Sequence, residues 1–467
     1  MLKDIIRKEL LDTISSLKFV FTFLLCTVMI LLSIYIGINN YRSDLKEYQA
    51  SVALNRSNLE SQPSYQALAG LGVKISKPPQ VLSTLVTGIQ NAVGRVASVK
   101  ESYDPELVDS KYSTSPIFSV FGDLDLEFIV RIVLSLLAIL FTYDAICGEK
   151  ESGTLKMSLA NSLPRDRLII GKAVGSFISL LIPLMVPLLL GLLILSLFPD
   201  ISLGREEWSR IGLLVLLFLI YISVFFSLGI FVSTLSTRSS VSILILLIAW
   251  VTFVTLVPKA AVIASGQIYP VPSVHEITAQ KDAFQQEIQG NVQKEVRDWV
   301  HTNSPKPGED PKAWQEKFTK YLEDSQQEAS RKIDEKNAAL ESEFQARRQR
   351  QDLIAMNLSR ISPASALMYA SMSLSGTGIN EHIRFLNSIK NYKPVWTKWA
   401  NSKRMRTLLL RKEQPKPDLS DMPRHTFTPE SFSQSARRAI PDFTIMLVLI
   451  ILFIAGAYVA FLKYDVR

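Results

Sequence analysis

Residues 173–198 read AVGSFISLLIPLMVPLLLGLLILSLF, an uncharged apolar run that decides the class of this protein. A helix rises about 1.5 Å per residue, so about 20 such residues cross a hydrocarbon core roughly 30 Å thick. Comparable runs recur along the chain and predict six membrane-spanning helices, over Phe19–Ile38, Phe128–Cys147, Ala173–Phe198, Ile211–Leu235, Val241–Pro258 and Phe443–Leu462. Runs of this length exclude a soluble enzyme, a disordered chain and a transmembrane β-barrel, whose strands alternate over about 10 residues.

The composition is typical of a membrane protein without catalytic chemistry of its own. Of 467 residues, 48% are hydrophobic and 20% are charged, and the formal net charge is +8. Cys26 and Cys147 lie in or beside apolar runs, which predicts neither a disulfide framework nor a CxxC metal pair. The four histidines are scattered, and no GxSxG, HExxH or H-x-E pattern occurs. We therefore expect no catalytic residue, no metal and no cofactor in this chain.

The orientation of the spans follows from lysine and arginine in the short loops. If the N-terminus is cytoplasmic, 12 basic residues lie inside: Lys3, Arg7, Lys8, Lys18, Lys150, Lys156, Arg165, Arg167, Lys172, Arg238, Lys463 and Arg467. Only Arg205 and Arg210 lie in the short outside loop. Because basic residues in short loops stay on the cytoplasmic side, both termini are predicted to be cytoplasmic.

The predicted fold is a mainly α polytopic membrane protein with a large, mostly helical extracytoplasmic domain. An interfacial amphipathic helix over 1–18 precedes the first span over 19–38. An extracytoplasmic segment over 39–127 and the second span over 128–147 follow. A cytoplasmic loop over 148–172 leads to spans three to five over 173–258. A second extracytoplasmic segment over 259–442 precedes 443–467, the last span with a short tail.

The spans hold few charges. Arg131 follows Glu127 by four residues, so the two can form an ion pair on one helix, while Asp144 lies near the inner end of that span. Such residues can line a polar path, or they can simply reach a headgroup boundary. This lining suits amphipathic cargo better than bare ions. Pro183 and Pro187 each remove a backbone donor and are expected to kink the third span.

The second outer segment carries a long helical pattern. Phe284, Ile288, Val292, Val296 and Val300 recur every four residues and share one helix face. A Pro- and Gly-containing break over 303–308 and the sequence Asp310-Pro311 then predict a second helix, so the two form a long hairpin.

Shorter elements are predicted on either side of the hairpin. Ser362-Pro363 begins a helix that ends at Gly376, and a short helix follows over 379–389. Segment 39–127 shows no strong periodicity beyond Val81–Val96, and its five prolines predict short elements.

A basic and aromatic stretch runs from Lys390 to Lys412 without an acidic residue. Outside a membrane, interleaved basic and aromatic side chains favour lipid headgroups or an acidic partner rather than nucleic acid. A solvated basic face is the alternative. The candidate contacts are Lys390, Lys393, Trp396, Lys398, Trp399, Lys403, Arg404 and Arg406.

The inside loop between the second and third spans carries the most informative motif. Residues 148–155 read GEKESGTL, residues 163–167 read LPRDR, and Gly171-Lys172 follows. The first of these is not an ATP site, because Thr154 stands where a phosphate-binding lysine is required. The pattern resembles the permease subunits of ABC-2 type transporters, the type V exporter architecture. The amphipathic start with Lys8-Glu9-Leu10 and the segment 362–386 are similar to a subgroup with a large outer insertion.

The resemblance implies a coupling loop that docks on a separate ABC ATPase, with ATP and magnesium bound in that partner. Its residues would be Glu149, Glu151, Gly153, Thr154, Leu155, Pro164, Arg167 and Lys172. It further implies an exporter in the bacterial inner membrane, with a second permease subunit in a homo- or heterodimer. Relatives with short outer loops are a poor guide to the substrate, because both outer segments are long here.

Two other functions stay open. In a mechanotransmission complex, the same ATP-driven motion would act on an extracytoplasmic partner and nothing would cross the membrane. The long hairpin favours this alternative. A membrane-anchored scaffold without an ATPase is the third possibility.

Overall fold

The structure is a computed structural model that describes residues 2–100, 106–108, 122–160, 164–305, 311–409 and 416–463. Among these residues, six helical segments are long and apolar enough to cross a membrane: Leu17–Glu60, Leu126–Ser152, Arg165–Leu197, Arg205–Leu235, Ser239–Ile268 and Phe432–Leu462. The predicted mainly α, six-span class is therefore confirmed. The chain divides into two compact units, one of residues 1–257 and 360–467 and one of residues 258–359.

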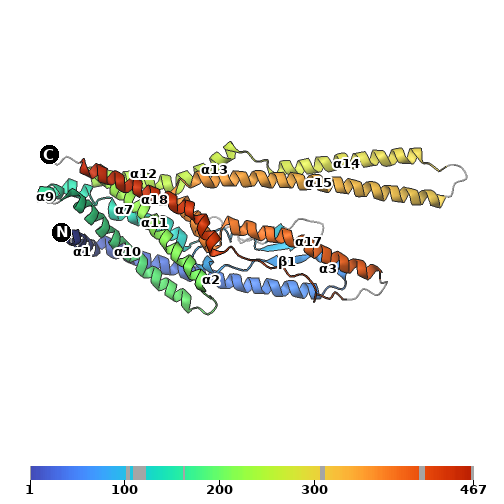
Figure 1. Ribbon diagram of the computed structural model, residues 1–467, viewed down its shortest axis with the longest axis horizontal. Coiled ribbons are helices and arrows are strands. Elements are labelled where there is room, and N and C mark those ends of the chain that lie inside the picture. The colour runs from blue at the N-terminus through green and yellow to red at the C-terminus, as the bar shows by residue number, and fades with distance from the viewer. Residues whose placement is uncertain are drawn as a thin grey trace. The chain divides into compact units, whose positions relative to one another are not determined.

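The larger unit begins with α1 (Leu2–Ile14) and α2 (Leu17–Glu60), which runs well beyond the first predicted span (Figure 1). The second span consists of α6 (Leu126–Phe128), a π-helical turn η2 (Ile129–Leu134), α7 (Ser135–Thr142) and α8 (Cys147–Ser152). After α9 (Thr154–Ala160) come α10 (Arg165–Leu197), α11 (Arg205–Leu235), α12 (Ser239–Val251) and a second π-helical turn η3 (Thr252–Leu256). The unit closes with α16 (Pro363–Ser375), α17 (Ile379–Leu409) and α18 (Phe432–Leu462).

Helix α11 forms the centre of the membrane bundle. Tyr221 and Phe225 are fully buried there, and α11 packs on α7 and α18. The Tyr221 hydroxyl donates to the carbonyl of Arg131 in the π-helical turn at 2.9 Å. The predicted ion pair in that turn is confirmed, since Arg131 Nε lies 2.9 Å from Glu127 Oε1. Pro183 and Pro187 lie inside α10 and are buried, and the kink they suggest stays a prediction.

The outer part of the larger unit has its own core. Helix α3 (Tyr65–Leu71), the short helical turn η1 (Val81–Thr84) and an antiparallel sheet in the order β1 (Val73–Ser76), β2 (Val96–Val99) and β3 (Glu106–Val108) occupy the segment whose fold the sequence left open. In β1–β2, Val73 pairs with Val99 and Ser76 with Val96. Helix α17 lies along α3 and the sheet, and the sheet lies between α17 and the later part of α2 (Figure 1).

Helix α17 corrects one prediction. The short helix expected over 379–389 continues to Leu409, even though Pro394 lies inside it. Phe385, Ile389, Tyr392 and Trp396 recur at helical spacing and are all buried against the outer core. Burial of this face offsets the backbone hydrogen bond that Pro394 removes. By contrast, α16 is as predicted, with Ser362 as its N-cap and Gly376 in the left-handed conformation at its end.

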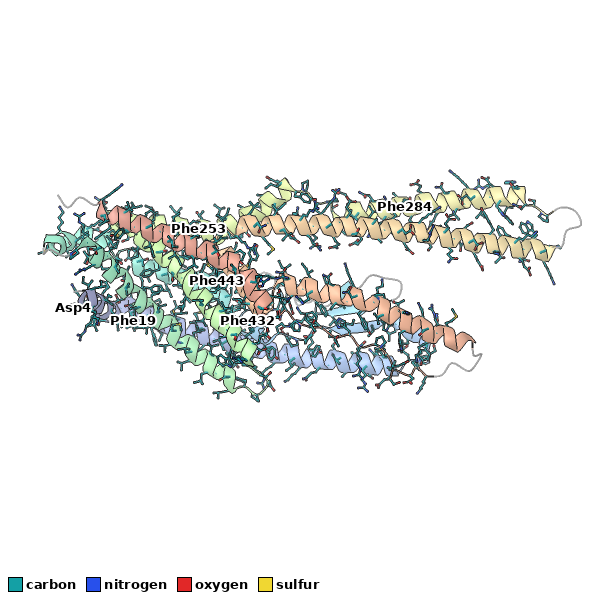
Figure 2. All side chains as sticks on the ribbon, viewed as in Figure 1. Asp4, Phe19, Phe253, Phe284, Phe432 and Phe443 are labelled. Atoms are coloured by element: carbon teal, nitrogen blue, oxygen red, sulfur yellow. The ribbon has the colours of Figure 1, made fainter. Side chains whose placement is uncertain are left out.

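The smaller unit contains α13 (Val257–Ile268) and the predicted hairpin of α14 (Val274–Thr302) and α15 (Pro311–Ser359). Phe284, one of the predicted stripe residues, lies on α14 (Figure 2). The two helices are joined by an ion pair between Lys281 Nζ and Glu341 Oε2 at 2.8 Å. Near the turn, the rings of Trp299 and Tyr321 stack at 5.0 Å. Both predicted hairpin helices are confirmed, while the predicted cap Asp310 lies outside the described residues.

Candidate functional site

The 148–172 loop begins in α8, the last part of the second spanning segment, and continues into α9, and these two short helices meet at Gly153. This glycine ends α8 with φ +76°, a left-handed conformation that side chains with a Cβ rarely adopt. Helix α9 follows directly, and Pro164 is the N-cap of α10. The predicted coupling loop therefore contains two short helices, and Gly153 makes the turn between them. Leu163 lies outside the described part of the chain.

Lys172 joins this loop to two other elements. Its Nζ lies 2.7 Å from Glu149 Oε1 on α8 and 3.3 Å from Glu9 Oε2 on α1, and the lysine side chain is only 12% exposed. Ser176, one turn further along α10, donates to Glu9 Oε1 at 3.1 Å. Glu9, Lys172 and Glu149 thus form an ionic bridge between α1, α10 and the loop.

Two glycines on α10 make this bridge possible. A Cβ added at Gly171 would lie 2.7 Å from Ile5 Cγ2, and one at Gly175 would lie 2.8 Å from the Cβ of Glu9. Only glycine therefore allows α1 to pack so closely on α10 at these positions. The Gly171-Lys172 and Lys8-Glu9-Leu10 motifs, far apart in the sequence, meet here.

The rest of the 148–172 loop is hydrogen-bonded to the short connection between α11 and α12. Glu151 Oε2 accepts the backbone N–H of Ser239 at 3.0 Å, at the first residue of α12, where a carboxylate is favoured by the helix dipole. Lys150 donates to the carbonyls of Thr234 and Ser236. The Ser233 hydroxyl accepts the N–H of Ile146 at 3.0 Å. The second, fourth and fifth spans are therefore connected through these contacts.

The remaining predicted loop residues divide into buried and exposed. Leu155 is 1% exposed and packs in the bundle core, so it anchors the loop rather than contacting a partner. Thr154 and Arg167 are exposed. Met157 on α9 is 72% exposed and lies outside the motifs from which the loop residues were predicted. Glu9 and Ser176 were not predicted to contact Lys172 or each other, because only packing brings them together.

The basic and aromatic stretch on α17 does not fit the headgroup prediction for its tryptophans. Trp396 is fully buried in the outer core, so its expected headgroup contact is wrong. The Trp399 ring lies 6.3 Å from that of Tyr65, which follows the far end of α2. Between Ile38 and that end, α2 rises roughly 33 Å, well beyond a headgroup layer.

The basic side chains of α17 are distributed over several environments. Lys403 pairs with Asp421 at 2.6 Å, and Lys393 and Arg404 are half-buried. Lys390 and Lys398 are exposed, and for these two residues contact with an acidic partner, or a solvated face, stays a prediction. The side chain of Arg406 lies outside the described part. Among the described residues, no group of three or more His, Cys, Asp or Glu side chains is arranged to hold a metal ion.

Comparison with known proteins agrees with this arrangement. The sequence matches the family described as ABC-2 family transporter protein over residues 4–466, nearly the whole chain. The chain belongs to the ABC-2 transporter family. It is also 33% identical over 78 residues to a probable ABC transporter permease protein, NosY, of Stutzerimonas stutzeri. That alignment spans 16% of this chain and 28% of the relative.

The ABC-2 membership confirms the resemblance read from the loop motifs. The protein is a multi-pass membrane component of an ABC transporter. The ionic bridge and the tied inner loops described above are how this ABC-2 permease holds its 148–172 loop.

Proposed function

We propose that this permease takes up force from a separate ABC ATPase through its 148–172 loop and uses it to export an amphipathic substrate. ATP and magnesium would be bound in the ATPase, and two permease subunits would act together. The observation that carries the proposal is the Glu9–Lys172–Glu149 bridge, which connects the loop to α1 and α10 through side chains.

The geometry divides the loop into a docking surface and a transmission path. The docking surface comprises exposed residues at the end of α8 and on α9: Ser152, Thr154, Lys156 and Met157. A push on α9 would reach α8 through the Gly153 turn. From there Glu149 would pull Lys172 and Glu9, while Glu151 and Lys150 would move α12 and the end of α11. Because Lys172 is only 12% exposed, its ion pairs are screened less by solvent and salt than exposed pairs, which are worth roughly 0–1 kcal/mol.

The two parts predict different defects, which makes the proposal testable. Glu149→Gln and Glu9→Gln each remove one charge of the bridge without enlarging the side chain, so ATPase binding is expected to persist while coupled ATP turnover and transport fall several-fold. Met157→Asp and Thr154→Arg change the docking surface, so co-purification of the ATPase itself is expected to fall. Both quantities are measured on the complex purified from membranes.

A matched control lies at the opposite end of the bundle. Arg42 pairs with Asp200 at 2.8 Å, and Arg42→Gln removes a similar charge without touching the loop. The transmission role is contradicted if Glu149→Gln behaves like Arg42→Gln in both assays. If no ATPase co-purifies with the unaltered permease, the coupling proposal fails and the scaffold function is left.

The hairpin supports one second candidate, mechanotransmission to an extracytoplasmic partner. Helices α14 and α15 contain 29 and 49 residues, and they bury mainly the seam between them. Such a long projection is unnecessary for moving a small amphipathic substrate across a bilayer. Transport of substrate by the complex reconstituted in liposomes would exclude this candidate. ATP turnover without transport, lost when the hairpin is removed, would favour it.

A further inference from the structure

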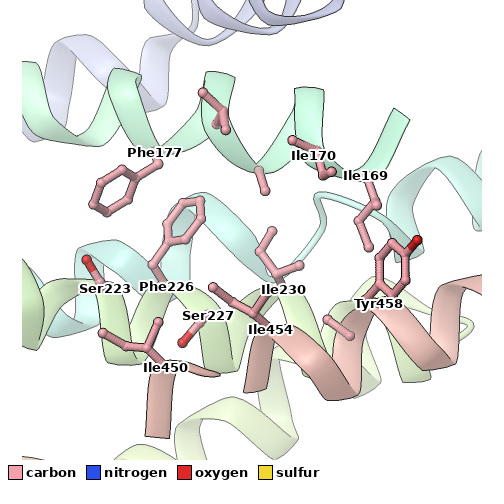
Figure 3. Close-up of a pocket in the computed structure, with 13 residues that line it drawn as sticks. Ile169, Ile170, Phe177, Ser223, Phe226, Ser227, Ile230, Ile450, Ile454 and Tyr458 are labelled. Atoms are coloured by element: carbon pink, nitrogen blue, oxygen red, sulfur yellow. The ribbon is translucent and has the colours of Figure 1, made fainter. Parts of the chain in front are cut away.

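An apolar groove lies among the membrane-spanning helices and begins near the start of α10, where Ile169 and Ile170 line it. Its volume is about 300 Å³. Helix α11 supplies the floor through Phe226, Ser227 and Ile230, which are all buried (Figure 3). The walls come from α10, with Ile170 and Val174, and from α18, with Ile454 and Tyr458.

The groove opens sideways between α10 and α18. The residues of both walls are half-exposed, at 46% for Ile170, 38% for Val174, 55% for Ile454 and 39% for Tyr458. Phe177 and Phe226 meet edge to face at 5.1 Å and close it toward the middle of the bundle (Figure 3). The opening therefore faces the hydrocarbon region that surrounds the spans.

Water is not a suitable occupant of the groove. Ser223 and Ser227 already donate to the carbonyls of Leu219 and Val224, at 2.7 and 2.9 Å, so water would find few partners there. If the groove stayed empty, its apolar lining would lose dispersion contacts. A flexible hydrocarbon chain needs no polar partner and restores these contacts.

Basic side chains stand at the inner mouth of the groove. Arg167, Ile170 and Val174 are spaced i, i+3 and i+7 and share one face of α10, and Arg167 is exposed one turn beyond the apolar wall. Arg165 Nη1 donates to the carbonyl of Leu462 at 2.8 Å, which holds the start of α10 beside the end of α18. The exposed Lys463 follows at that end. A phosphate at this mouth would meet a guanidinium and an ammonium group.

We propose that this groove binds one acyl chain of an anionic phospholipid, whose phosphate lies at Arg167 and Lys463. The site does not rest on the proposed function. The lipid would act as a filler between α10 and α18, two helices whose mutual packing the groove otherwise interrupts.

Photolabelling of the full-length protein tests the site. The protein is reconstituted in phosphatidylcholine vesicles that contain a minor share of phosphatidylglycerol with a photoreactive acyl chain, and labelled residues are mapped by mass spectrometry. We expect labels concentrated on Ile170, Val174 and Tyr458. Val174→Trp should fill the groove and reduce this labelling several-fold, whereas Val186→Trp, at a 41% exposed position of the same helix outside the groove, should not.

A second pair of variants, on α18, keeps the proposal testable if Val174→Trp fails to fold. Ile454→Trp should reduce labelling, and Leu452→Trp, 57% exposed on another face of α18, should not. Arg167→Gln should lower the preference for phosphatidylglycerol over an equally photoreactive phosphatidylcholine about fivefold.

Several results would overturn the proposal. Labels spread evenly over the lipid-facing residues of α10 and α18, or unaffected by both groove-filling variants, would show that no chain is held. Equal labelling by photoreactive phosphatidylglycerol and phosphatidylcholine would show that the site does not select an anionic headgroup. Disulfide formation between two copies that carry cysteine at position 174 would show that a second copy covers the groove instead.

Discussion

At the scale of single residues, Gly153 shows how a backbone angle can matter where no side chain does. Nothing lies within 4 Å of the position its Cβ would take, so a substitution there meets no steric obstacle from neighbours. Its φ of +76° remains, and the left-handed region costs an ordinary residue roughly 1–2 kcal/mol. The effect of substitution should therefore depend on backbone preference alone.

This leads to a graded prediction for the turn between α8 and α9. Gly153→Asn should retain most ATPase association, because asparagine tolerates the left-handed region, whereas Gly153→Val should lose several-fold, because a β-branched residue does not. The assay is co-purification of the ATPase at matched membrane levels. Gly212→Val, in open space on helical backbone of α11, is the control and should have little effect. Equal losses for valine and asparagine would contradict the backbone explanation.

His382 gives the outer core a pH dependence. Burial, with a smaller contribution from the Lys77 charge, lowers the pKa of His382 to about 4 from an ordinary 6.5. The unfolded chain therefore binds this proton more readily than the folded one, so stability falls as the pH drops from 6.5 toward 4. His425, whose pKa is also lowered by burial, adds in the same direction.

We expect the melting temperature to fall as the pH is lowered from 6.5 toward 4, and to fall less in the His382→Gln variant. The measurement is thermal unfolding of the full-length protein in detergent, with His275→Gln on α14 as the control for an outer histidine in an exposed position. If both variants follow the unaltered protein across the window, His382 is not the group responsible.

At the scale of elements, α17 illustrates how one helix can combine a buried and an exposed face. Trp396 lies in the outer core with Phe385 and Ile389, while Lys390 and Lys398 point away from it. The stretch looked interfacial in sequence because its aromatic and basic residues alternate. In the fold only Lys390 and Lys398 lie on the exposed face, Lys403 pairs with Asp421, and the aromatic face packs on α3 and the sheet.

Tryptophan substitutions on α17 should therefore affect stability rather than lipid binding. Trp396→Ala is expected to cost about 3–5 kcal/mol, as for other large aromatic residues removed from a core, while Trp399→Ala, half-buried, should cost less. Chemical denaturation of the full-length protein measures both. Binding to anionic vesicles that decreased in Trp396→Ala while stability stayed unchanged would restore the headgroup interpretation.

At the scale of the whole molecule, the inside-and-outside assignment rests on the basic residues of the short loops. Single cysteines at Ser304 and Ser420, both exposed, should react from outside with an impermeant maleimide in a background lacking Cys26 and Cys147. Cysteines at Ser152 and Ser240, also exposed, should react only after the membrane is opened. Ser240 serves better than Ser239, whose N–H is bound to Glu151. Outside labelling of Ser152 would invert the topology and end the ATPase proposal.

Local patterns in the sequence were sufficient for the spans, the hairpin and α16. Each depends on apolar length, a repeat of three to four residues, or a cap such as Ser362-Pro363, and all of these lie within one short stretch of chain. The loop motifs were likewise sufficient for the ABC-2 family. The sequence alone therefore determined the class of the protein and most of its helices.

Only the tertiary structure decided how these pieces act together. It brought Glu9 and Glu149 to Lys172 and placed the Glu151 carboxylate at the first N–H of α12. It also buried Trp396 in the outer core. It also formed the sheet of segment 39–127 and the groove between α10 and α18. These features join residues that are far apart along the chain. Which helix faces meet depends on how the helices pack on one another, and a local sequence repeat does not contain that information.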